Sequence, residues 1–200
     1  MNTWQVNSEV VYLLSKITEQ DLNPRSIRPV FVFVAAAIAV LRGVMVMDKV
    51  ITAEEEARLL ETLDVLLDED EEVYRLTQLT IRGIDREQIF LDPQALLTLS
   101  DPLSISARLL LLAFGYEMSA ADGSIDFREQ MYLHSIASRL RVEMPHLQAI
   151  EAGFMEQTAP SPESAREVLA LLGNDRFEEI DPILVKAAQY MRLRLKVAQS

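Results

Sequence analysis

Residues 29–47 read PVFVFVAAAIAVLRGVMVM, a run in which the only charged side chain is that of Arg42. The 18 residues that begin at Val30 just reach the length of a membrane-spanning helix. However, the longest uncharged part covers only residues 29–41, and Asp48 follows the run at once. A helix that is apolar on every side is also what the centre of a large helical bundle requires. We therefore predict a buried core helix, and contact with a membrane is the alternative.

Helix signals also occur along the rest of the chain. At five places an Asn, Asp or Ser precedes a proline, a pair typical of a helix start because the side chain caps free amides and proline has no N–H to lose. These five residues are Asn23, Asp92, Asp101, Ser161 and Asp181. The patterns predict helices near residues 5–20, 27–47, 53–67, 69–82, 93–99, 102–121, 127–141, 143–157, 162–172 and 182–197, with Gly83 and Gly173 just after helix ends. No stretch has the alternation of a strand, so the predicted fold class is all-α.

The composition is that of an acidic globular protein. Asp and Glu number 31 against 19 Lys and Arg, which gives a formal net charge of −12, and half of the residues are apolar. Nucleic acid is therefore not an expected partner, because phosphate contacts need clustered basic residues. The chain has no cysteine, which excludes thiol catalysis, and it has only two histidines, His134 and His146. No secretory signal is evident at the N-terminus, and a cytoplasmic location is expected.

Two parts of the chain are similar at a shift of 74 residues. Each follows an apolar helix and precedes an amphipathic one. Gly43 and Gly115 interrupt the two apolar helices at similar depth, where they would let neighbouring helices approach closely. We predict a single-domain helical bundle with an internal pseudo-twofold duplication of an apolar helix, an acidic loop and an amphipathic helix. The shift aligns Asp48 with Asp122, Ile51 with Ile125, and Glu55 with Glu129.

The acidic loops match only part of a calcium-binding pattern. Residues 122–129 match the second half of an EF-hand loop, which ends in a bidentate glutamate. The first half offers no side-chain oxygen, because its first and third positions would be Met118 and Ala120. In the other copy Lys49 replaces the turn glycine. A standard EF-hand is therefore excluded in both copies.

Two interpretations of these loops stay open. One is structural, because Thr52 with Glu55, and Asp126 with Glu129, have the spacing of a capping box at a helix start. The other is a site for a divalent cation such as Ca²⁺ or Mg²⁺, which oxygen ligands would hold. The candidate metal ligands are Asp48, Glu55, Asp122 and Glu129.

Residues 120–129 read AADGSIDFRE and resemble the signature of the tellurite-resistance TerB-like family. This family includes the helical domain attached to certain membrane-linked J-domain co-chaperones. The resemblance covers roughly residues 28–157, and Lys49 departs from the family's glycine. It implies an all-helical, acidic, non-catalytic domain of the tellurite and stress response, which acts as an interaction platform at or near the inner membrane. Metal sensing is also implied.

The resemblance suggests three parts in the chain and one leading function. We expect an N-terminal helix in residues 1–27, a TerB-like duplicated helical domain in residues 28–157, and a C-terminal helical extension on the same core in residues 158–200. The leading hypothesis is a non-enzymatic interaction protein with protein partners at the inner face of the membrane. The alternatives are a carboxylate-metal enzyme at the duplicated loops and a peripheral membrane module that uses residues 30–47.

Overall fold

The computed structural model describes residues 6–47, 53–67, 71–120, 125–155 and 161–197. Within these ranges the chain is helical and contains no strand, which confirms the predicted all-α bundle. The α-helices are α1 (Ser8–Thr18), α2 (Pro29–Val46), α3 (Ala53–Leu67), α4 (Glu71–Glu87), α5 (Pro93–Ser100), α6 (Ile105–Ser119), α7 (Phe127–Arg139), α8 (Met144–Phe154), α9 (Pro162–Leu171) and α10 (Pro182–Val197). Two short 3-10 helices, η1 (Ile89–Leu91) and η2 (Asn174–Arg176), precede α5 and α10.

Helix α2 lies at the centre of the molecule. It is the one helix among the described residues that is long and apolar enough to cross a membrane, yet 16 of its 18 residues are buried. Its most extensive contact is with the second apolar helix, α6, where the rings of Phe33 and Phe114 meet edge to face with centroids 6.2 Å apart. The predicted burial of this helix is confirmed.

Helix α7 packs closely on both apolar helices. A Cβ added to Gly43 of α2 would overlap the ring of Tyr132, and one added to Gly115 of α6 would lie 2.6 Å from Cδ2 of Leu133. Both contacts are possible only because these two positions carry no side chain. The expected close approach at the two glycines is therefore present, and it is α7 that makes it.

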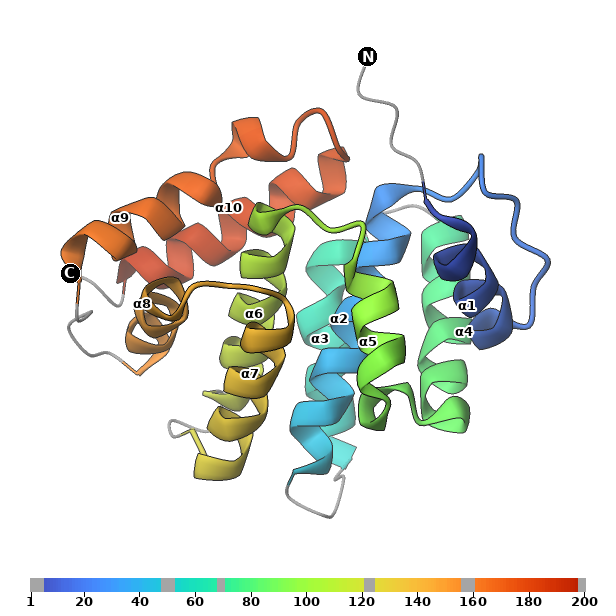
Figure 1. Ribbon diagram of the computed structural model, residues 1–200, viewed down its shortest axis with the longest axis horizontal. Coiled ribbons are helices and arrows are strands. Elements are labelled where there is room, and N and C mark those ends of the chain that lie inside the picture. The colour runs from blue at the N-terminus through green and yellow to red at the C-terminus, as the bar shows by residue number, and fades with distance from the viewer. Residues whose placement is uncertain (1–5, 48–52, 68–70, 121–124, 156–160, 198–200) are drawn as a thin grey trace.

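The remaining helices cover the two ends of this centre (Figure 1). Helix α1 packs on α4 and α5 at one end, whereas α8, α9 and α10 form the other end, where α10 also contacts α3 and α6. A single hydrophobic core runs from Val10 in α1 to Leu195 in α10. The first and last helices therefore belong to the same core as the centre.

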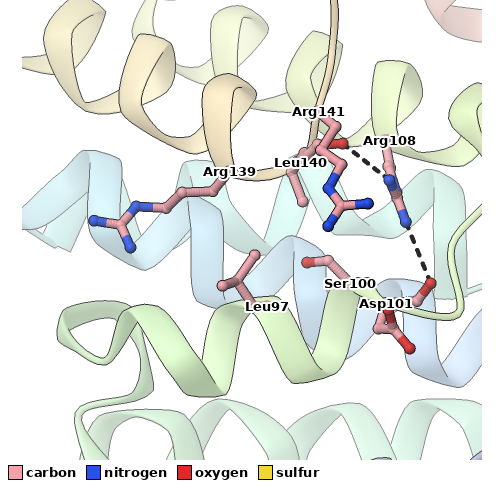
Figure 2. Close-up of a pocket in the computed structure, with 7 residues that line it drawn as sticks. All are labelled: Leu97, Ser100, Asp101, Arg108, Arg139, Leu140 and Arg141. Atoms are coloured by element: carbon pink, nitrogen blue, oxygen red, sulfur yellow. Dashed lines mark hydrogen bonds between the residues drawn. The ribbon is translucent and has the colours of Figure 1, made fainter.

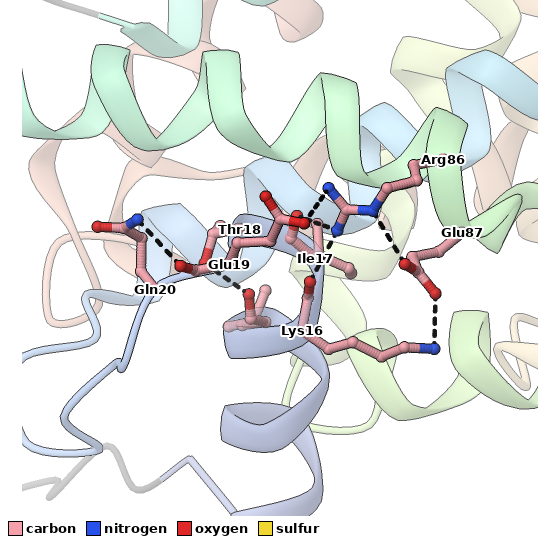
Figure 3. Close-up of polar contacts among 8 residues, drawn as sticks. Lys16, Ile17, Thr18, Glu19, Gln20, Arg86 and Glu87 are labelled. Carbon is pink, nitrogen blue, oxygen red and sulfur yellow. Dashed lines mark hydrogen bonds and ion pairs between the residues drawn. The ribbon is translucent and has the colours of Figure 1, made fainter.

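The end of α1 is fixed to α4 by a polar network (Figure 3). Arg86 donates to the main-chain carbonyls of Lys16 at 2.9 Å and Ile17 at 3.3 Å, both in the last turn of α1. Its guanidinium also forms ion pairs with Glu19 and Glu87, each at 3.0 Å. Glu87 is paired in addition with the ammonium of Lys16 at 2.6 Å. Arg86 thus caps a helix end and has its charge matched by carboxylates.

Three of the five predicted cap–proline pairs start helices. Asp92, Ser161 and Asp181 accept hydrogen bonds from amides of the first turns of α5, α9 and α10. The prediction is wrong at Asn23, which caps a turn, and at Asp101, which ends α5.

The predicted helix end at Gly83 is also wrong. Helix α4 continues to Glu87, and Gly83 lies against the main-chain carbonyl of Ile17. Only a residue without Cβ leaves space for the end of α1 at this point, so tertiary contact explains the glycine.

Candidate functional site

The structure describes the four candidate metal ligands only in part. Asp48 and Asp122 lie outside the described residues, as does Thr52. Glu55 lies in the first turn of α3, although its side chain is not described. Glu129 is described, and its Oε2 accepts the main-chain N–H of Asp126 at 3.1 Å.

The second acidic loop leads into a capping box. Besides the bond to Glu129, the carboxylate of Asp126 accepts the main-chain N–H of Arg128 at 2.8 Å, and both halves of the box are present. The Arg128 N–H, followed by the Arg128 side chain, lowers the pKa of Asp126. The capping interpretation is confirmed for this pair. Among the described residues no three His, Asp or Glu side chains are grouped to hold a metal ion.

A buried carboxylate links α6 to α10. Glu117 is 9% exposed, and its Oε1 accepts the hydroxyl of Tyr190 at 2.6 Å and Nε of Arg194 at 3.2 Å. Burial raises the pKa of Glu117, against the lowering effect of these two partners. Burial, followed by the bond to Glu117, raises the pKa of Tyr190 to about 12. No local pattern predicts this pairing, because Glu117 lies more than 70 positions from its partners in the chain.

A second buried carboxylate links α7 to α8. Glu151 accepts the side-chain amide of Gln130 and lies 3.1 Å from Nε2 of His134. Tyr116 of α6 lies near this carboxylate, and burial is the main reason that its pKa is raised. His134 of α7 and Glu151 of α8 thus connect two helices of the bundle.

A third buried charge joins α2 to α3 and α4. Arg42, the one charged side chain of the central apolar run, is 4% exposed. It contacts Asp85 at 2.7 Å and Glu56 at 3.4 Å. Burial raises the pKa of Asp85, while the charge of Arg42 opposes that shift. An arginine inside this core is thus matched by acids on two neighbouring helices.

A basic pocket lies where α5, α6 and α7 meet (Figure 2). Its cavity volume is about 280 Å³. Arg108 comes from α6, Arg139 from the last turn of α7, and Arg141 from the chain just after it. Figure 2 shows Arg141 and Arg108 near Asp101, whereas Arg139 extends toward the opposite end. We call this the arginine pocket, lined by Leu97, Ser100, Asp101, Arg108, Arg139, Leu140 and Arg141.

The sequence analysis missed the arginine pocket. Its three arginines come from two helices and a loop. Arg108 lies more than 30 positions before the other two, so the three form no local motif. The only available signal is the pair Arg139 and Arg141 at a predicted helix end, where basic residues are ordinary. Tertiary structure is what brings Arg108 to them.

The comparisons with known proteins add no family assignment. No family model matches the chain, and neither a curated protein nor a solved structure matches it. The TerB-like resemblance therefore continues to depend on residues 120–129 and the related segment near Asp48.

Proposed function

We propose that this chain is a non-enzymatic, TerB-like interaction protein of the tellurite and stress-response class. The observation that carries the proposal is a pair of apolar side chains on the outer side of α7. Phe127 is 69% exposed and Met131 is 54% exposed, and they lie one turn apart. Aromatic and Met side chains are enriched at protein interfaces, so two of them exposed one turn apart support a surface for a protein partner.

The place of this pair in the fold supports the proposal. Phe127 is the first residue of α7 and directly follows the capping residue Asp126, within the segment that resembles the family. The opposite side of α7 buries Leu133 and Ile136 in the core. A rigid helix thus presents two apolar side chains to a partner at little cost in conformational entropy.

The arrangement of the central helices is consistent with the duplicated unit that the 74-residue shift predicts. Helices α3 and α7 each follow one apolar helix, and each contacts both α2 and α6. Two copies of one unit that share a core around a pseudo-twofold axis would make these reciprocal contacts. We infer a duplication on this ground and on the aligned loops.

The proposal is tested with a double variant, Phe127→Ser with Met131→Ser. A matched control, Tyr12→Ser with Leu91→Ser, changes two other exposed apolar residues. We expect crosslinked partners to be shared by the wild type and the control and absent from the α7 variant.

The same three proteins are then expressed in a deletion strain grown on tellurite, where only the α7 variant should fail to restore growth. Identical partners for all three proteins, or a deletion without a growth defect, would contradict the proposal.

In this proposal the second acidic loop acts as a helix start, and a cation at Asp48, Glu55, Asp122 and Glu129 stays the open alternative. The described carboxylates of the second loop are engaged in the start of α7. We therefore expect Ca²⁺ and Mg²⁺ to leave the melting temperature of metal-stripped protein unchanged. A rise that Asp122→Asn abolishes would assign a cation to the loop instead, because a ligand of the folded state raises its stability.

A further inference from the structure

The arginine pocket has an excess of positive charge that the rest of the chain does not share. Three arginines line it against one acid, Asp101, although acids outnumber Lys and Arg by 31 to 19 in the whole sequence. Within the described ranges, Arg108, Arg139 and Arg141 form no ion pair with a carboxylate. Water screens the repulsion between these arginines because Arg139 and Arg141 are exposed, and an anion bound among them would remove what remains.

Arg108 is held in place before any ligand binds. Its Nη1 donates to the main-chain carbonyl of Leu140 at 2.9 Å, and its Nη2 donates to that of Asp101 at 3.3 Å. The side chain is half-buried, and its Nε–H is buried without a hydrogen-bond partner in the described part of the chain. A guanidinium fixed in this way loses little conformational entropy when it binds an anion.

Arg141 reaches the pocket from an unfavourable backbone conformation. Its φ of 56° places it in the left-handed region, just after the end of α7. The N–H of Val142 bonds to the carbonyl of Ala137 and that of Arg141 to Ser138, which is the Schellman pattern. Glycine is the favoured residue at this position, because arginine carries a Cβ that strains the backbone. Glu19 and Gln88 have a similar φ at other helix ends, so the conformation is not particular to the pocket, but at position 141 it places an arginine at the cavity.

The chemistry of the lining selects the ligand. Guanidinium groups bind phosphate through paired N–H donors, more strongly than a neutral donor would. The hydroxyl of Ser100 already donates to the carbonyl of Leu96 at 2.6 Å, so the arginines supply the donors. Leu97 and Leu140 add apolar surface beside them. A cavity of about 280 Å³ suits a phosphate group with a small substituent.

We propose that the arginine pocket binds a phosphate group, either as free phosphate or as a small phosphomonoester. Arg108 and Arg141 hold the phosphate oxygens, and Arg139 adds charge at the far end of the cavity. The site is independent of the apolar pair on α7, because it lies at the opposite end of that helix.

Calorimetric titration of the full chain tests the proposal, with inorganic phosphate, phenyl phosphate and benzoate as probes at one ionic strength. We expect both phosphates to bind, and Arg141→Gly to weaken their binding by about tenfold. Arg82→Gln, which removes an exposed arginine of α4, should bind as the wild type does. Tighter binding of phenyl phosphate would assign a monoester, and equal affinities would assign free phosphate.

Three results would overturn the proposal. The first is no binding of either phosphate, which would leave the arginines as partners of helix ends only. The second is an unchanged affinity in Arg141→Gly, a variant whose fold is expected to persist because glycine suits its backbone. The third is binding of benzoate as tight as that of phenyl phosphate, which would assign a carboxylate ligand.

Discussion

Arg86 and Arg108 make the same contact at two places in the molecule, with different surroundings. Each donates to two main-chain carbonyls at the ends of neighbouring helices, Arg86 at the end of α1 and Arg108 at the ends of α7 and α5. Around Arg86 lie the carboxylates of Glu19 and Glu87. Around Arg108 lie a second arginine, Arg141, and the single acid Asp101, with Arg139 further along the pocket.

This difference separates two roles of an arginine, the capping of a helix end and the binding of a ligand. Arg86 shows that the contact with a helix end is compatible with a neutralised guanidinium, as expected for a purely structural residue. The excess charge beside Arg108 is therefore not needed for capping. We interpret the α1–α4 network as structural and the arginine pocket as a binding site.

The largest effect is expected when the anchored arginine of the pocket is removed. Arg108→Met removes the charged donor from the half-buried carbonyl of Leu140 and from the exposed carbonyl of Asp101, so the free energy of unfolding should fall by about 2 kcal/mol. Urea unfolding followed by circular dichroism measures the loss. A loss as small as that of the exposed control Arg82→Gln would show that Arg108 does not hold the helix ends.

A smaller loss is expected for the equivalent change in the α1–α4 network. The side chain of Arg86 is 40% exposed, so water replaces part of what Arg86→Met removes, and the loss should be about 1 kcal/mol. The same urea experiment gives the value. Because the arginine is exposed and ion-paired, the loss should shrink at high salt. A loss larger than that of Arg108→Met would reverse the order of the two sites.

A gain in stability is expected at Arg141. Arg141→Gly removes the backbone strain of a left-handed residue, although glycine also gains entropy in the unfolded chain, so a net rise of about 0.5 kcal/mol is expected. Thermal and urea unfolding without phosphate measure this rise. A variant less stable than the wild type would mean that the Arg141 side chain stabilises the fold, and the comparison with Arg86 would fail.

The smallest effect concerns the pKa of Glu87. The Lys16 ammonium, followed by Arg86, lowers this pKa below its ordinary value. The stabilising contribution is therefore present above the ordinary glutamate pKa and is lost as the pH falls through the lowered value. In Lys16→Met the pKa of Glu87 should rise but stay below the ordinary value, because Arg86 still donates to it. Carboxyl NMR titration measures the shift, and an unchanged pKa would show that Lys16 does not contribute.

Much of the fold could be predicted because its signals are local. The ten predicted helices are all present, and the capping box of Asp126 and Glu129 follows from their spacing alone. The errors occur where a tertiary contact or a neighbouring residue determines where a helix begins or ends. Gly83 lies inside a helix because the end of α1 rests on it, and Ser104 rather than Asp101 caps α6.

The candidate sites were less predictable for the same reason. The exposure of Phe127 depends on which side of α7 faces the core, and periodicity alone does not place its first turn. The arginine pocket joins Arg108 to residues more than 30 positions further along the chain. The net charge of the whole sequence indicates an acidic protein. It does not show that the charge is positive at the arginine pocket.

The two arginine sites are compared most directly by titration with phosphate. The measured quantity is the NMR chemical shift of each arginine Nε–Hε group. We predict that the signals of Arg108 and Arg141 move in a saturable way at constant ionic strength, while that of Arg86 stays in place. Equal shifts at all three arginines, or no saturable shift at Arg108 and Arg141, would contradict the assignment of one site to structure and the other to binding.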